Sequence, residues 1–307
     1  MVDTPVDTLL IVAAPTITLL LLVAVGLDLQ PSDFARVQKR PGLIALGVLA
    51  PPLILPMLAV GLIVALHPPP AAAGGLLLLV CCPAGGISNT YSYLARASTA
   101  LAVTLTATSC VLALVTIPIA SVMLERVWHQ PLPYSIPIGV LFTQVFALLG
   151  VPIGVGMFAR ARWPNQALRS QPIVQRVGFL LLAGLLALAL SGRLGVVRLD
   201  FGPAAALAIG FTVAAFVIGW LVALLARADS PQQFTMAAEF ATRNVAIATA
   251  LGLLLTARPE LVLFAGLYLT CEIPLLILAA TAYRRWFAGE CPATPDRVAP
   301  TAFESIT

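Results

Sequence analysis

Residues 83–89, Pro-Ala-Gly-Gly-Ile-Ser-Asn, interrupt a stretch of chain that otherwise has the composition of a membrane-spanning helix. Residues 74–82 before it are entirely apolar, and the first charge after it is Arg96. The proline lacks a backbone donor and clashes with the preceding turn, while the two glycines weaken the helix further. Broken backbone at membrane depth is tolerated only where it is buried in protein or lines a polar cavity. Because Ser88 and Asn89, which can coordinate a cation, follow the break directly, the stretch predicts a binding site within the membrane.

The composition of the whole chain places it among membrane proteins. The 307 residues are 60% hydrophobic and 10% charged, with a mean hydropathy of +1.00, whereas soluble domains carry about 25% charged residues. Several runs approach the roughly 20 apolar residues that cross a bilayer as helix. The chain is therefore expected to be an all-α polytopic membrane protein in which the spans leave no room for a soluble catalytic or nucleic-acid-binding domain.

Hydrophobic runs predict nine transmembrane helices arranged in two halves. The expected helices cover residues 7–28, 41–66, 71–97, 98–124, 136–158, 177–190, 203–225, 232–256 and 260–283, with a basic loop over 160–176. The first half is 1–135, the second 136–286, and 287–307 form a polar tail. Most of the 17 basic residues fall on one side of this layout. By the positive-inside rule the N-terminus is outside and the C-terminus cytoplasmic, in what we expect to be a bacterial inner membrane.

Three charged residues stand out because they lie away from the ends of the predicted spans, where each costs at least about 2.5–3.5 kcal/mol. They are Glu239, Arg243 and Glu272. Glu239 and Arg243 are four residues apart, on one helical face, so one interpretation is an ion pair that joins their helix to its neighbours. The other interpretation is that Arg243-Asn244 marks a polar interruption in the second half, at the place that corresponds to Ser88-Asn89 in the first half.

Paired interrupted segments, one in each half, are the best sequence indication of the midplane site of an inverted-repeat transporter. The expected broken helices are 71–97 and 232–256. No glycine or proline lies between Glu239 and Leu251, so the second break is inferred from polarity alone. We expect the two broken helices to cross, with Ser88, Asn89 and Glu239 converging.

The chain resembles the bile acid:sodium symporter family in several motifs. The first is Cys82 to Asn89 followed by Tyr93-Leu94-Ala95-Arg96-Ala97; the others are residues 26–29 with 32–34, and 239–244. The resemblance implies the family's nine-span form, with a core domain that contains the crossed helices and a panel domain that moves against it. It also implies sodium-driven uptake of an organic anion, either bile-acid-like or a small carboxylate.

The resemblance assigns two sodium sites, of which this chain retains one. The first site is implied to consist of Ser88, Asn89, Thr106 and Glu239, all hard oxygen donors, although a further hydroxyl of the family falls on Ala102. At the second site the family's two glutamines fall on Pro51 and Arg243. We expect Arg243 to replace the second sodium, so that one ion is coupled and only a remnant site is left, formed by Phe240, Thr242 and Arg243.

The substrate site implied by the resemblance is lined by Gly86, Ile87, Asn244 and Glu272. Glu272 either pairs with Arg243 or carries a proton. A sodium-independent or proton-coupled organic anion carrier of the same fold is therefore an alternative function. A channel or a non-transporting receptor is a less favoured one. An intramembrane enzyme is disfavoured, because no histidine lies in the spans and the two carboxylates are on different helices.

Overall fold

The computed structural model describes residues 5–28, 41–128, 143, 146–190, 201–252 and 259–287. These residues are almost entirely helical. The first six helices are α1 (Pro5–Asp28), α3 (Pro41–Leu66), α4 (Pro70–Cys81), α5 (Ile87–Leu94), α6 (Thr99–Trp128) and the short π-helix η2 (Phe146–Gly150). The others are α8 (Val151–Arg162), α9 (Pro164–Leu190), α10 (Phe201–Leu225), α11 (Ser230–Ala241), α12 (Val245–Ala250) and α13 (Pro259–Trp286).

Four of the described helices are long and apolar enough to cross a membrane. They are Pro41–Leu66, Thr99–Pro118, Phe201–Leu225 and Leu261–Trp286. Large apolar side chains such as Leu53, Met57 and Leu278 are exposed on their outer faces, which suits a lipid environment. The chain is thus an all-α membrane protein, and the count of nine spans stays a prediction. The polar motif at 32–34 and the tail beyond residue 287 lie outside the described residues.

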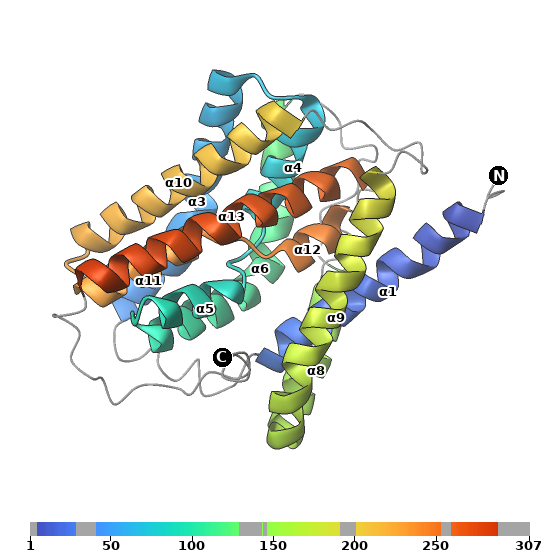
Figure 1. Ribbon diagram of the computed structural model, residues 1–307, viewed down its shortest axis with the longest axis horizontal. Coiled ribbons are helices and arrows are strands. Elements are labelled where there is room, and N and C mark those ends of the chain that lie inside the picture. The colour runs from blue at the N-terminus through green and yellow to red at the C-terminus, as the bar shows by residue number, and fades with distance from the viewer. Residues whose placement is uncertain are drawn as a thin grey trace.

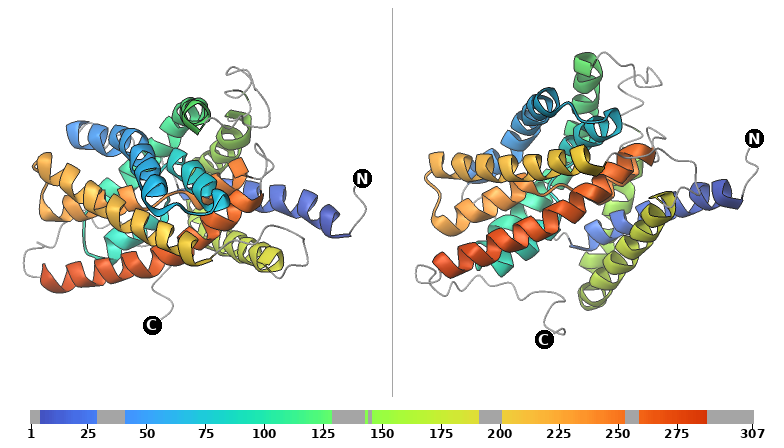
Figure 2. Two further views of the ribbon diagram at one scale, coloured as in Figure 1. Left: turned by 90° about the horizontal axis from the view of Figure 1, so that it is seen from above. Right: turned by 45° about the horizontal axis from the view of Figure 1, so that its top comes forward.

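The helices pack as two groups (Figure 1). The larger group contains α3, α4, α5, α6, α10, α11 and α13, and the smaller contains α1, α8 and α9. The views in Figure 2 show the smaller group projecting to one side of the larger. Within the smaller group α1 and α8 approach so closely that a Cβ on Gly156 would lie 2.4 Å from the carbonyl oxygen of Val23. Glycine is required there because two helix backbones are in contact.

The first expected interruption is present. Helix α4 ends at Cys81, Cys82 is extended (φ −77°, ψ 150°), and α5 begins only at Ile87. A Cβ on Gly85 would lie 2.9 Å from the carbonyl oxygen of Arg243. The glycine therefore lets the backbone of a distant segment approach directly.

The second interruption is also present, at residues 242–244. Helix α11 ends at Ala241, Thr242 is extended (φ −99°, ψ 123°), and α12 begins at Val245. Asn244 is the N-cap of α12, and its Oδ1 accepts a hydrogen bond from the Ile247 amide at 3.1 Å. The break thus depends on asparagine capping rather than on glycine or proline.

The two interruptions lie against each other at the centre of the molecule. Ala84 and Arg243 form an isolated antiparallel bridge, and the Asn244 amide donates to the Pro83 carbonyl oxygen at 2.9 Å. Proline cannot donate in return, but its carbonyl accepts. Backbone groups freed by the two breaks therefore satisfy each other, as the membrane interior requires.

One expectation about the smaller group is wrong. Residues 164–176, expected as part of a basic loop, are helical and form the first half of α9. Pro164 occupies the first helical position, where proline is favoured because its missing N–H has no partner in a helix anyway. The basic residues of this segment are spread over a helix instead of a loop.

Candidate functional site

A buried carboxylate surrounded by hydroxyl groups lies beside the crossing of the broken helices. Glu239, in the last turn of α11, is only 2% exposed. The Ser88 hydroxyl on α5 lies 2.5 Å from Glu239 Oε1, and the Thr106 hydroxyl on α6 lies 3.0 and 3.3 Å from Oε1 and Oε2. The two hydroxyl oxygens are 3.4 Å apart. Three helices distant in sequence thus bring three of the expected sodium ligands together.

Asn89 and Ala102 occupy the places expected of them along their helices. Asn89 follows Ser88 on α5, and its Oδ1 is buried with no hydrogen-bond partner among the described residues. Ala102 is fully buried on α6, one helical turn before Thr106. The Asn89 amide oxygen can only accept a hydrogen bond or coordinate a cation. The residues present thus fit a sodium ion, with hard oxygen donors and one full negative charge.

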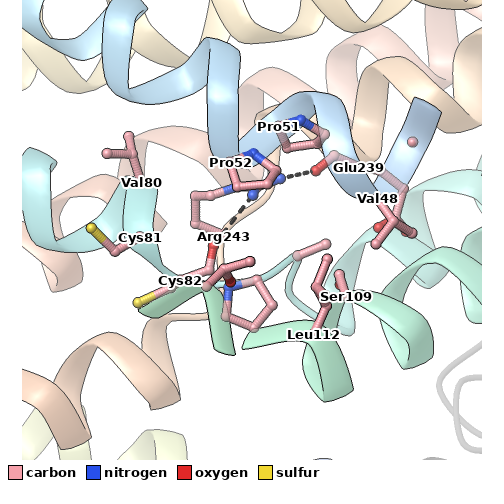
Figure 3. A pocket seen from close by; sticks show the side chains of 14 residues that line it. Val48, Pro51, Pro52, Val80, Cys81, Cys82, Ser109, Leu112, Glu239 and Arg243 are labelled. Carbon is pink, nitrogen blue, oxygen red and sulfur yellow. Dashed lines mark hydrogen bonds between the residues drawn. The ribbon is translucent and has the colours of Figure 1, made fainter. Parts of the chain in front are cut away.

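Arg243 does not pair with the Glu239 carboxylate, so the ion-pair interpretation of these two side chains is wrong. Its guanidinium donates from Nη1 to the Cys82 carbonyl oxygen at 3.3 Å and from Nη2 to the backbone carbonyl oxygen of Glu239. Figure 3 shows both contacts as dashed lines. The guanidinium thereby lies at the C-terminal ends of α4 and α11, where helix dipoles favour a positive charge.

Of the three residues expected to form the remnant of a second cation site, Phe240, Thr242 and Arg243, only Arg243 lines a pocket beside the crossing. Pro51, Glu239 and Arg243 line one pocket (Figure 3). Phe240 is fully buried in α11 and Thr242 is fully buried just after it. The guanidinium of Arg243 binds the backbone carbonyl oxygens of Cys82 and Glu239.

A second pocket lies between the two helix groups. Gly86, Ile87 and Asn244 line it, as expected for substrate residues, together with Thr106 and Arg243. Its free volume of about 50 Å³ holds a few water molecules rather than a steroid. A bulky ligand therefore requires the smaller helix group to move away from the crossing.

The smaller helix group contributes three polar residues to this pocket that sequence reasoning missed. Asp28 comes from the end of α1, and Gln171 and Gln175 come from α9. The Gln171 amide donates to Gln175 Oε1 at 2.9 Å, as expected for residues four apart on one helical face. The same spacing, together with proline at position 164, could have identified a helix here.

Glu272 is not in this pocket, although it was expected to be. It is completely buried on α13, and neither of its carboxyl oxygens has a hydrogen-bond partner in the described part of the chain. Of the two interpretations left open for Glu272, the pair with Arg243 does not take the form of a hydrogen bond, since the Arg243 guanidinium donates to the carbonyl oxygens of Cys82 and Glu239. Glu272 therefore stands apart from the pocket that the other three residues line.

Comparison with known proteins agrees with this architecture. Residues 15–198 match the sodium bile acid symporter family. The chain belongs to this family. Because the family consists of transporters, membership in it identifies the chain as a transporter rather than an intramembrane enzyme.

Relatives of the chain include bacterial and mammalian family members. It is 30% identical to YocS of Bacillus subtilis, an uncharacterized sodium-dependent transporter, over 76% of the chain and 71% of YocS. It is 24% identical to the sodium-dependent organic anion transporter of Bos taurus, over 74% of the chain and 59% of that protein. Identity to the human ileal sodium/bile acid cotransporter is 27%, over 51% of the chain and 46% of that protein. The matched part thus spans about half the length of these two mammalian relatives.

Proposed function

We propose that this protein transports an organic monoanion across the membrane by alternating access, driven by sodium bound at Ser88, Asn89, Thr106 and Glu239. The observation that carries the proposal is the Glu239 carboxylate, which is buried at the crossing and surrounded by hydroxyls. Burying a charge without compensation costs several kcal/mol. Sodium provides this compensation, and so favours the closed, reorienting form of the site.

The pocket between the helix groups is the proposed anion site. Since Asn244 Oδ1 caps α12, the group it offers a ligand is its NH₂ donor. Arg243 adds positive charge, and the first turn of α5 at Gly86 and Ile87 presents the positive end of a helix. These groups support binding of a carboxylate or sulfonate.

The opposite wall of the pocket supports a substrate that also carries hydroxyl groups. Gln171 and Gln175 supply polar groups from α9, and the Asp28 carboxylate of α1 reaches the start of α5, where its Oδ2 would lie 3.1 Å from a Cβ on Gly86. A molecule with an anionic end and one or more hydroxyls therefore bridges the crossing and the smaller helix group. Such a bridge links substrate occupancy to the relative position of the two groups.

Alternating access in this proposal is movement of α1, α8 and α9, as a panel, against a core that holds the crossing. The close backbone contact between Gly26 and Gly156 makes α1 and α8 move together. The two halves are proposed to be inverted repeats, in an inner membrane with the N-terminus outside. The names of the bovine and human relatives support an organic anion or bile acid as substrate.

The experiment is uptake of radiolabelled taurocholate into proteoliposomes with an inward sodium gradient or an equal potassium gradient. We expect sodium-driven accumulation by the unmodified protein and its loss in Glu239→Gln. The matched variant Gln232→Glu, at the other end of α11, should keep it. Equal uptake in both gradients would favour the sodium-independent or proton-coupled carrier instead. Absence of taurocholate counterflow and of counterflow for smaller hydroxylated carboxylates would contradict transport altogether.

A further inference from the structure

The Asp28 carboxylate belongs to the smaller helix group but lies against the crossing of the broken helices. Asp28 is the last residue of α1, and its side chain lines the pocket between the two helix groups. Its Oδ2 would lie 3.1 Å from a Cβ on Gly86. Because glycine has no Cβ, the carboxylate takes the space beside the backbone at the start of α5.

The start of α5 is a favourable place for a carboxylate. Gly86 is the N-cap of this helix, and no side chain caps it there. The free amides of the first turn and the helix dipole give this end a partial positive charge, which attracts an anion. Asp28 is partly buried, so salt screens this attraction less than it screens one at the surface.

The anionic group of the substrate is proposed to bind at the same end of the pocket. The other positive group on this wall is Arg243, which is 3% exposed and whose Nε has no hydrogen-bond partner among the described residues. Two carboxylates in one small buried site repel each other strongly. Asp28 and the anionic group of a substrate therefore exclude each other from the start of α5.

The position of Asp28 distinguishes a competitor of the substrate from a binding partner. A carboxylate that recognised a hydroxyl or amine of the substrate should lie away from the anion-binding groups. Gln171 and Gln175 on α9 supply polar groups of the kind that a hydroxyl binds. Asp28 lies instead at the anion-binding end of the pocket, where it takes the place of the substrate's own anionic group.

Movement of the smaller helix group carries Asp28 with it. Gly26, two residues earlier on α1, packs so closely on α8 that a Cβ would collide with the Ile153 carbonyl oxygen. Helix α1 also contacts α9 and, at the crossing, α12. The closed pocket has a free volume of about 50 Å³, which holds a few water molecules. Separation of the two groups therefore enlarges the pocket and withdraws the carboxylate from α5 in one movement.

We propose that Asp28 is an internal competitor of the substrate, a tethered carboxylate that occupies the anion subsite at the start of α5 while the carrier is empty. It holds the smaller helix group against the crossing, and the anionic group of the substrate takes its place when the groups separate. An anion must then bring further contacts, such as hydroxyls for Gln171 and Gln175, in order to displace it. The inference rests on the proposed function and adds to it selection against small anions that lack hydroxyls.

The first experiment measures opening of the empty carrier in potassium, without any organic anion. Val245→Cys places a cysteine in the pocket, at a position that is 3% exposed. Its alkylation by N-ethylmaleimide, which is larger than a few water molecules, is followed in the full-length protein by peptide mass spectrometry. Asp28→Asn keeps the shape of the side chain and removes its charge, so alkylation should become at least about fivefold faster. Asp229→Asn, at the N-cap of α11, should leave the rate unchanged.

Chemical rescue separates a lost anion from a loosened fold. In Asp28→Ala the missing side chain leaves room for a free carboxylate, so formate should restore slow alkylation at position 245. Formamide, the neutral counterpart of formate, should not. Unchanged alkylation in both Asp28 variants would overturn the inference. An accelerated rate that formate does not reduce, or that formamide reduces equally, would overturn it as well.

Uptake of taurocholate separates this inference from the proposed function. Apparent affinity rises with the population of the binding-competent form, so Asp28→Asn should need at least about fivefold less taurocholate for half-maximal uptake. A higher requirement would make Asp28 a binding partner of the substrate and would refute the competition. Sodium-driven uptake together with unchanged alkylation refutes this inference alone. Faster alkylation without any sodium-driven uptake refutes the proposed function and leaves the contact between Asp28 and α5 standing.

Discussion

Replacing Arg243 by glutamine tests whether its guanidinium stands in the place of a cation. The Cys82 carbonyl lies beyond the end of α4, and the Glu239 carbonyl is in the last turn of α11. Neither oxygen has a partner within its own helix end, so both bind the guanidinium. Arg243→Gln removes this charge and shortens the side chain, which leaves the two oxygens facing a small polar space.

The magnitude follows from those two contacts. A buried polar group that loses its partner costs about 1–3 kcal/mol, so two carbonyls cost about 2–6 kcal/mol when only potassium is present. A sodium ion that binds in the vacated space at 100 times its Kd returns about 2.7 kcal/mol. At about 2–4 °C per kcal/mol for a chain of 150–250 residues, the variant should gain roughly 5–10 °C more from sodium than the unmodified protein gains.

The assay is thermal unfolding of purified protein in sodium or potassium at equal ionic strength. Arg243→Lys is the matched control, because it keeps the charge and should show no additional sodium response. If Arg243→Gln is as stable as the unmodified protein in potassium and gains nothing extra from sodium, the guanidinium does not replace a cation. The reasoning about the second family site is then refuted.

Two further changes test the first sodium site and the smaller helix group. Thr106→Val removes a hydroxyl that bonds to a carboxylate, a contact worth about 1.5–3 kcal/mol, so half-maximal thermal stabilisation should need at least tenfold more sodium. Thr104→Val removes a hydroxyl that bonds to its own helix and should leave the sodium requirement unchanged. Equal effects of the two changes would argue against Thr106 as a sodium ligand. Gly156→Ala places a Cβ 2.4 Å from the Val23 carbonyl oxygen and should destabilise the protein by about 1–3 kcal/mol, which is measured as a lower melting temperature. The control is Gly154→Ala on the same helix, whose Cβ would meet nothing within 4 Å. Similar melting temperatures of the two variants would show that α1 and α8 separate easily.

Much of the architecture was predictable because its causes are local. A proline and two glycines within four residues identify the first break, since a missing donor and missing Cβ atoms act wherever the segment lies. Composition identifies the membrane environment in the same way. The approach of Ser88 to Glu239 was expected from the paired interruptions, whereas Thr106 was assigned through resemblance to a family rather than from any property of its own segment.

The errors occurred where a local signal was weak or a residue's partner was distant. The second break is not among the errors, since it was expected from polarity and is present; its local signal is the N-cap asparagine at position 244, without glycine or proline. The start of α9 was missed because the basic residues of this segment were interpreted as a loop, although the proline at position 164 favours the start of a helix. An ion pair of Arg243 with a carboxylate was one of the interpretations left open, and Arg243 binds two backbone oxygens instead.

By itself the sequence determined where this chain must leave the helical conformation and which charges must be buried, because backbone chemistry and hydropathy act residue by residue. Only the tertiary structure decided what each freed or buried group meets. The Pro83 carbonyl meets the Asn244 amide, and Ser88 meets a carboxylate 151 residues away. Among the residues that the structure describes, Glu272 meets no hydrogen-bond donor. Such pairings depend on which segments the packing brings together at one depth in the membrane, where water cannot substitute for a missing partner.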